Sequence, residues 1–157
     1  MTTNLESIAN KIDSVIECII KDRQVIEVAA LEQGNALMSA RIFGSEGGFS
    51  LDGSELGEYS DAYLRKRLRN NKGSNLNKNL IYDGNLFRSI QIGRSNNKKT
   101  ALGFTDQDLA DIARFQEESD VQVNEPIFGF NSEEMEICLE VIKNGVQQSL
   151  KRCFKTA

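Results

Sequence analysis

Three closely spaced carboxylates, Asp106, Asp108 and Asp111, are the side chains in this sequence with the clearest capacity for acid–base chemistry. They fall, however, at the start of an expected helix, where acidic side chains stabilise the amino end. The 157-residue sequence contains no histidine, which excludes histidine-based catalytic triads, histidine-ligated metals and a histidine pH switch. We therefore expect a protein that is not an enzyme, with no catalytic, metal-binding or cofactor-binding residues.

Cysteine is the other residue type that could do chemistry, and it occurs at positions 18, 138 and 153. The number is odd, no Cys-x-x-Cys spacing is present, and Cys138 and Cys153 are expected on one helix about 22 Å apart. We therefore expect neither a disulfide framework nor a zinc site, but three small buried thiols, with a reactive thiol as the less favoured alternative. This usage is typical of a protein made in a cytoplasm. Neither a secretory signal nor a membrane span is expected.

The charges are unevenly distributed along the chain, although the net charge is only −4. Residues 65–99 contain ten bases and one acid, which gives +9, and the remaining nine bases and 22 acids give −13. Such a segment is a solvated loop, a nucleic-acid surface, or a positive face that meets a negative face of another subunit. Because residues 65–78 include no aromatic side chain to stack on bases, subunit contact is favoured. The candidate contact residues are Arg65, Lys66, Arg67, Arg69, Lys72 and Lys78.

These residues are expected to lie in a single α+β domain spanning residues 1–157. Apolar residues recur at spacings of three and four from Leu5 to Ile19, which predicts a long N-terminal helix that continues toward Arg41. About 35 helical residues would span about 50 Å, more than the domain's own core requires, so part of the helix is expected to pack on a neighbouring subunit. Residues 44–79 are predicted to be a flexible or partner-ordered insertion that carries one short helix at 59–68.

The second half of the chain is predicted to form a small antiparallel sheet, a short helix and a C-terminal amphipathic helix. Residues 86–92 and 100–104 have the composition of a β-hairpin. A short helix is expected after Asp106, followed by an extended edge segment at 125–130. The last helix is expected to begin at Asn131 or Ser132, because acids in its first turn and bases in its last turn match the helix dipole.

Three segments, in this order, carry a resemblance to a known family. The first is Ile42-Phe43, then Asp52-Gly53, Gly57-Glu58-Tyr59-Ser60 and the basic run 63–69. The second is residues 79–90, Asn-Leu-Ile-Tyr-Asp-Gly-Asn-Leu-Phe-Arg-Ser-Ile, and the third combines Ala101-Leu102-Gly103-Phe104, residues 112–116 and residues 124–130. Over residues 42 to 155 this order resembles the small virion-morphogenesis proteins of tailed phages, the tail-completion or head–tail joining group.

The resemblance implies an α+β subunit that assembles as a ring at the neck or tail end of a phage, without catalytic residues. It implies a virion protein made in the host bacterial cytoplasm, in rings of six or twelve copies. The implied partners are other neck or tail proteins, with DNA passing through the lumen. A ring needs two complementary patches on each subunit, and the charge partition offers them. The alternative is a nucleic-acid-binding module that uses residues 65–78, although the acidic remainder argues against it.

Overall fold

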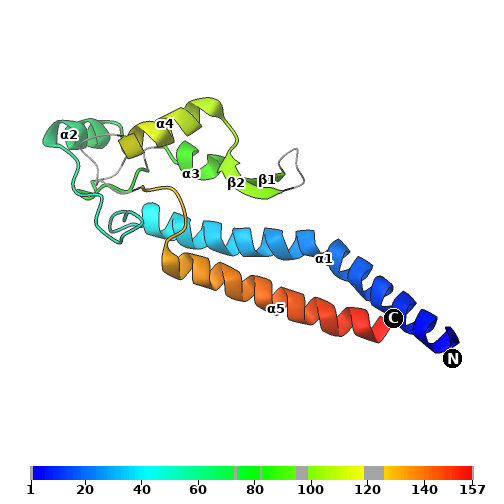
Figure 1. The fold of residues 1–157 in the computed structure, drawn as a ribbon. Helices are drawn as coiled ribbons and strands as arrows, with labels where there is room; N and C mark the ends of the chain where they lie inside the picture. The colour runs from blue at the N-terminus through cyan, green and yellow to red at the C-terminus, as the bar shows by residue number, and fades with distance from the viewer. Residues whose placement is uncertain (1, 73, 82, 95–98, 119–125, 157) are drawn as a thin grey trace.

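The computed structural model describes residues 2–72, 74–81, 83–94, 99–118 and 126–156, and it has the α+β architecture expected from the sequence. Two long helices, α1 (Thr2–Ile42) and α5 (Ser132–Thr156), run antiparallel side by side (Figure 1). The remaining elements form a small head over the C-terminal part of α1. They are α2 (Asp61–Arg69), α3 (Asn85–Ser89), β1 (Ile90–Arg94), β2 (Thr100–Phe104) and α4 (Gln107–Glu118).

Glycine allows α1 and α5 to approach closely. A Cβ atom on Gly34 would lie 2.6 Å from Cζ of Phe130 and 2.7 Å from Sγ of Cys138, and one on Gly145 would lie 3.0 Å from the side chain of Ile26. Real Cβ atoms essentially never make contacts as short as those at Gly34, so a side chain there requires local rearrangement, and the contact at Gly145 is tight enough that Ile26 would have to shift slightly. Gly34 is therefore a packing point in a continuous helix and does not interrupt it.

The two described strands pair antiparallel, from Ile90 opposite Phe104 to Arg94 opposite Thr100. The predicted first strand, residues 86–92, is partly wrong because its first half belongs to α3. The carboxylate of Asp83 accepts a hydrogen bond of 2.9 Å from the backbone N–H of Asn85, and this turn initiates the helix. Helical spacing then buries Leu86 and Ser89 together. The turn between the two strands is predicted at residues 94–97, and all of it except Arg94, the last residue of β1, lies outside the described residues.

Residues 44–79 make many hydrogen bonds within their own subunit. The backbone N–H of Gly48 donates to Lys78, that of Leu56 donates back to Gly48, and that of Lys78 donates to Gly57, at 2.7, 2.9 and 2.8 Å. Leu56 is 2% exposed and belongs to the core. The short helix expected at 59–68 is present as α2. That the segment is flexible until a partner orders it stays a prediction.

The hydrophobic core lies where the C-terminal end of α1 meets the head. It consists of Met38, Ile42, Phe43, Leu56, Leu86, Ile90, Ala113 and Ile127. The hairpin also contacts the middle of α1, where the hydroxyl of Thr100 donates a hydrogen bond of 2.9 Å to the carboxylate of Glu27. Pro126 precedes α5 in an irregular segment, and no edge strand is formed in the described part of 125–130.

Candidate assembly surfaces

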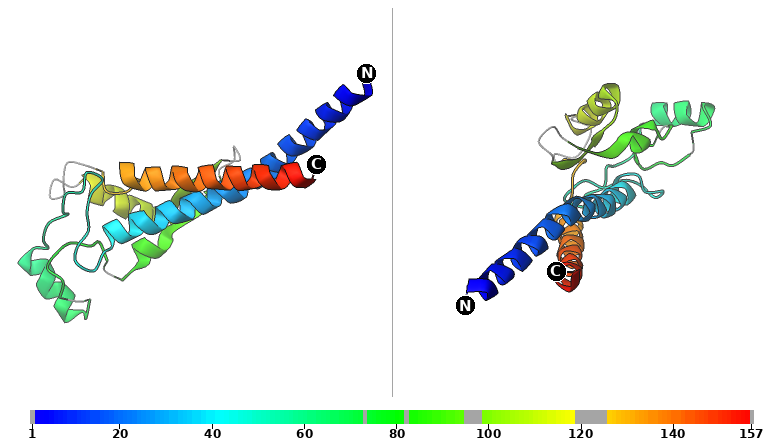
Figure 2. Two further views of the ribbon diagram at one scale, coloured as in Figure 1. Left: turned by 90° about the horizontal axis from the view of Figure 1, so that it is seen from below. Right: turned by 90° about the vertical axis from the view of Figure 1, so that its right-hand side faces the viewer.

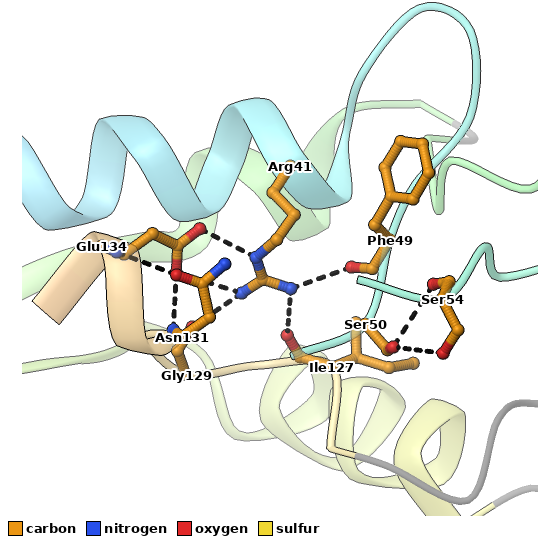
Figure 3. Close-up of polar contacts among 8 residues, drawn as sticks. All are labelled: Arg41, Phe49, Ser50, Ser54, Ile127, Gly129, Asn131 and Glu134. Carbon is orange, nitrogen blue, oxygen red and sulfur yellow. Dashed lines mark hydrogen bonds and ion pairs between the residues drawn. The ribbon is translucent and has the colours of Figure 1, made fainter. Parts of the chain in front are cut away.

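The side chain of Arg41 joins four separate segments of the fold (Figure 3). Its guanidinium pairs with the carboxylate of Glu134 through Nε and Oε1 at 2.8 Å. It also donates to the carbonyl oxygens of Phe49, Ile127 and Gly129, at 2.8, 3.2 and 2.8 Å. Both charged side chains are 10% exposed or less, so the ion pair is shielded from water.

Glu134 is held in place by the start of α5. Its carboxylate accepts from the backbone N–H of Asn131 at 2.9 Å, and the amide oxygen of Asn131 accepts from the N–H of Glu134 at 2.8 Å. This reciprocal arrangement is a capping box, and it confirms the expected start of the last helix. The Arg41 cluster therefore fixes the head relative to the helical pair. This role of Arg41 could not be predicted from the sequence, because an arginine near the end of a predicted helix is usually exposed.

The structure separates the six basic candidates into exposed and buried side chains. Arg65, Lys66 and Arg69 are exposed on α2, and Lys72 is half-buried just beyond it. Arg67 is 3% exposed, donates to the carbonyl oxygens of Ile81 and Lys72 at 2.6 and 2.7 Å, and lies over the ring of Tyr59. Lys78 is 8% exposed, and burial lowers its pKa. Arg67 and Lys78 are thus committed to the subunit interior, a role that charge counting did not reveal.

The amino-terminal part of α1 carries a row of exposed apolar side chains, which we call the α1 stripe. Its members are Leu5, Ile8, Ile12, Ile16 and Ile20, exposed by 73, 51, 52, 47 and 64%. The bonded pairs Cys18–Cys153 and Asp22–Ser149 set the register of the two helices, which places Thr156 level with the buried Val15. Residues 2–14 therefore extend past the end of α5, as Figure 1 and the left view of Figure 2 show.

A second apolar surface is an open groove of about 770 Å³ between α2 and α4, which we call the α2–α4 groove. Its apolar and aromatic lining consists of Tyr59, Tyr63, Leu80, Leu86, Leu109, Ile112 and Phe115. Ile112 and Phe115 are 47% and 67% exposed. Leu80 has a φ of +53°, a backbone conformation that leucine rarely adopts. Helices α2 and α4, which supply residues of this lining, lie at the end of the molecule opposite the free end of α1 (Figures 1 and 2).

Cys18 and Cys153 form a disulfide between α1 and α5, with their Cα atoms 5.9 Å apart. The expectation of three free thiols was therefore wrong for this pair, because two cysteines 135 residues apart meet only through the antiparallel helix packing. Cys138 is free and buried, as expected, and burial raises the pKa of its thiol. Beside the disulfide, the carboxylate of Asp22 accepts from Ser149 at 2.6 Å and pairs with Arg152. The bond from Ser149 is the main cause of the lowered pKa of Asp22.

The acidic residues considered for catalysis lie at the N-terminal cap and in the first turns of α4. The carboxylate of Asp106 accepts from the backbone N–H groups of Asp108 and Leu109, at 2.8 and 3.3 Å. Asp111 is exposed and pairs with Arg114 at 3.4 Å, one turn along the same helix. This arrangement is that of an N-capped surface helix.

Asp52 lies at the centre of a tight polar turn in the segment after α1. Its carboxylate accepts from the hydroxyls of Ser50 and Ser54 and from the backbone N–H of Ser54, the last at 2.9 Å. These bonds to the ionised form lower the pKa of Asp52 to about 2. The turn also meets the segment before α5, because the N–H of Leu51 donates to the carbonyl of Pro126 at 3.0 Å.

Comparisons of the chain with protein-family models, with curated proteins and with solved structures gave no match. Within the described ranges, no helix is both long enough and apolar enough to cross a membrane.

Proposed function

We propose that this protein is a structural subunit of a tailed-phage virion, which forms a ring at the neck or tail end in tail completion or head–tail joining. The resemblance of residues 42–155 to virion-morphogenesis proteins supports the phage assignment. The observation that carries the assembly role is the α1 stripe, five large apolar side chains in the N-terminal half of α1 that are 47–73% exposed. Contiguous exposed apolar surface of this kind marks an interaction site in a soluble protein.

The size of the stripe indicates that assembly needs a matching surface. Complete burial of a leucine or isoleucine side chain contributes about 1.5–3 kcal/mol. The five side chains are on average more than half exposed, so covering the stripe contributes about 4–8 kcal/mol. Association costs about 4–15 kcal/mol of translational and rotational freedom. The stripe therefore supports a stable complex only together with further contacts.

The disulfide is consistent with a particle that leaves the cell. Protein disulfides persist outside a reducing cytoplasm, and this one ties the two helices close to the point where α1 extends beyond α5. The subunit would be made with reduced thiols and would become cross-linked within itself after release. The helical pair would then hold the α1 stripe in a fixed position under extracellular conditions.

Two measurements test this proposal. Electron microscopy of the purified chain should show closed rings of one size with a central opening. In lysates of the organism that encodes the chain, gradient-purified tailed particles should contain it, as detected by mass spectrometry. Tailed particles that lack the chain would refute the virion assignment, even if the chain forms rings on its own.

The alternative function is nucleic-acid binding, which the three exposed bases of α2 favour. It predicts that labelled double-stranded DNA binds the chain, with an affinity that falls steeply as salt is raised. Replacement of Arg65, Lys66 and Arg69 by glutamine should abolish that binding. Tight DNA binding by a chain that remains a single subunit would favour this alternative over the ring.

A further inference from the structure

We propose that the α1 stripe of one copy docks in the α2–α4 groove of a second copy, so that identical subunits join head to tail. The inference deepens the proposed function and rests on it for its setting. It rests on its own observations for the geometry, which are two apolar surfaces at opposite ends of one subunit. Within a single chain these surfaces cannot cover each other.

The chemistry of the two surfaces is that of a helix and its groove. Leu5, Ile8 and Ile12 follow the three- and four-residue spacing by which an amphipathic helix anchors in an apolar groove. The groove offers the exposed side chains of Ile112 and Phe115 on one wall. On the opposite side, the rings of Tyr63 in α2 and of Tyr59 just before α2 line the groove.

Contacts within a single subunit hold the lining of the α2–α4 groove in place. The rings of Tyr59 and Tyr63 lie 5.0 Å apart, and the buried guanidinium of Arg67 supports Tyr59 from 4.8 Å. The hydroxyl of Tyr59 accepts from the backbone N–H of Asn79 at 3.3 Å. The amide oxygen of Asn79 in turn accepts from the N–H of Ile81 at 3.2 Å, and this bond closes the turn that holds Leu80 at positive φ. Residues held in rarely populated backbone conformations, as Leu80 is, cluster at functional sites of proteins.

The charges favour head-to-tail docking over pairing of two stripes. Residues 5–20 carry three acids and one base, a net charge of −2. Pairing two copies of this segment would bring like charges together, whereas α2 presents three exposed bases and one acid. Lys66 is one turn from Tyr63 and therefore shares its side of α2. The α4 side chains that line the groove are uncharged, and the rest of its lining includes the exposed Glu58 and Asp83 and the buried Lys78.

A head-to-tail contact uses both surfaces of every subunit and generates a closed ring or an open filament. Pairing of two stripes would stop at a dimer and would leave the α2–α4 groove uncovered. One contact, repeated around a ring, therefore accounts for both exposed apolar surfaces.

The test uses two full-length variants, each of which damages one surface. The stripe variant carries Ile8→Asp and Ile12→Asp, and the groove variant carries Phe115→Asp. All three positions are at least 45% exposed, so both variants should keep the far-ultraviolet circular dichroism of the wild type. Asn10→Asp with Ser14→Asp is the matched control, since it adds the same charge to the opposite side of the same helix. Masses are measured by light scattering.

Each variant alone should associate about 100-fold more weakly than the wild type, and the control should associate normally. An equimolar mixture of the two variants should give a complex of twice the 17.5 kDa subunit mass and nothing larger, because one intact stripe still meets one intact groove. Normal assembly by the groove variant would overturn the proposal. A wild-type protein with the mass of one subunit would also overturn it, as would an equimolar mixture of the two variants in which no complex forms. A normal groove variant beside a disabled stripe variant would show stripe-to-stripe pairing instead. Failure of this docking leaves the presence of the chain in virions, measured separately, unaffected.

Discussion

Replacement of Arg41 by methionine should destabilise the fold more than any change of an exposed charge. Methionine keeps an unbranched apolar stem of similar shape but removes the guanidinium that pairs with Glu134. The carboxylate, only 7% exposed, then stays buried without its cation, and three carbonyl oxygens lose a donor. Removal of one partner of a buried ion pair costs about 3–5 kcal/mol. The whole domain is stabilised by about 5–15 kcal/mol.

Thermal and urea unfolding followed by far-ultraviolet circular dichroism would measure this loss. For a chain of this length each kcal/mol corresponds to about 2–4 °C, so Tm should fall by about 6–20 °C. Arg114→Met is the matched control, because Arg114 is 67% exposed and pairs with Asp111 and Glu118 at 3.4 and 3.9 Å. Exposed pairs contribute about 0–1 kcal/mol. An Arg41→Met variant as stable as the Arg114→Met variant would refute the reasoning.

The double variant Arg41→Met with Glu134→Gln separates a lost attraction from a stranded charge. Glutamine retains an oxygen that can accept from the N–H of Asn131, but it carries no charge. If the stranded carboxylate causes most of the loss, the double variant should be more stable than Arg41→Met alone. A double variant that is less stable by the full sum of both single changes would contradict this explanation.

Three further predictions concern packing, the disulfide and pH. Gly34→Ala should cost about 1–3 kcal/mol of unfolding free energy, because its Cβ enters occupied space, whereas Gly93→Ala, with no atom within 4 Å, should be near neutral; equal effects would contradict the packing argument. Reduction of the Cys18–Cys153 bond should lower the stability by about 2–5 kcal/mol, and a thiol reagent should leave the Tm of Cys18→Ser unchanged. The lowered pKa of Asp52 means that its contribution to stability is complete above its ordinary pKa of 3.8 and is lost as pH falls through about 2. In acid titrations the Asp52→Asn variant should therefore lose less stability over that pH window than the wild type.

The long elements could be predicted from the sequence because their apolar residues recur at helical spacing and their ends carry capping residues and charges that match the helix dipole. The apolar spacing from Leu5 to Ile19 predicted α1, and the acidic first turn after Asn131 predicted the start of α5. The predicted second strand, residues 100–104, matches β2, whereas the predicted first strand begins at residue 86, before the start of β1 at Ile90. There the local turn at Asp83 outweighed the β-favouring composition of the following residues.

The features that could not be predicted depend on contacts between segments far apart in the sequence. Arg67 belongs to a basic run and reads as exposed, yet it fills a buried position between Tyr59 and two backbone carbonyls. Cys18 has no nearby cysteine, and its partner is found only when α5 returns along α1. The apolar row from Leu5 and the packing of part of its helix on a neighbouring subunit were predicted from the sequence. The extent of the exposed row became clear only once the end of α5 was placed.

Light scattering of the full-length protein at low and at high salt tests the central claim most directly. The account predicts a mass that is a whole-number multiple of the 17.5 kDa subunit, larger than two, and that falls toward smaller species as salt screens the charges at the contact. A mass of one subunit at every protein and salt concentration would contradict the account.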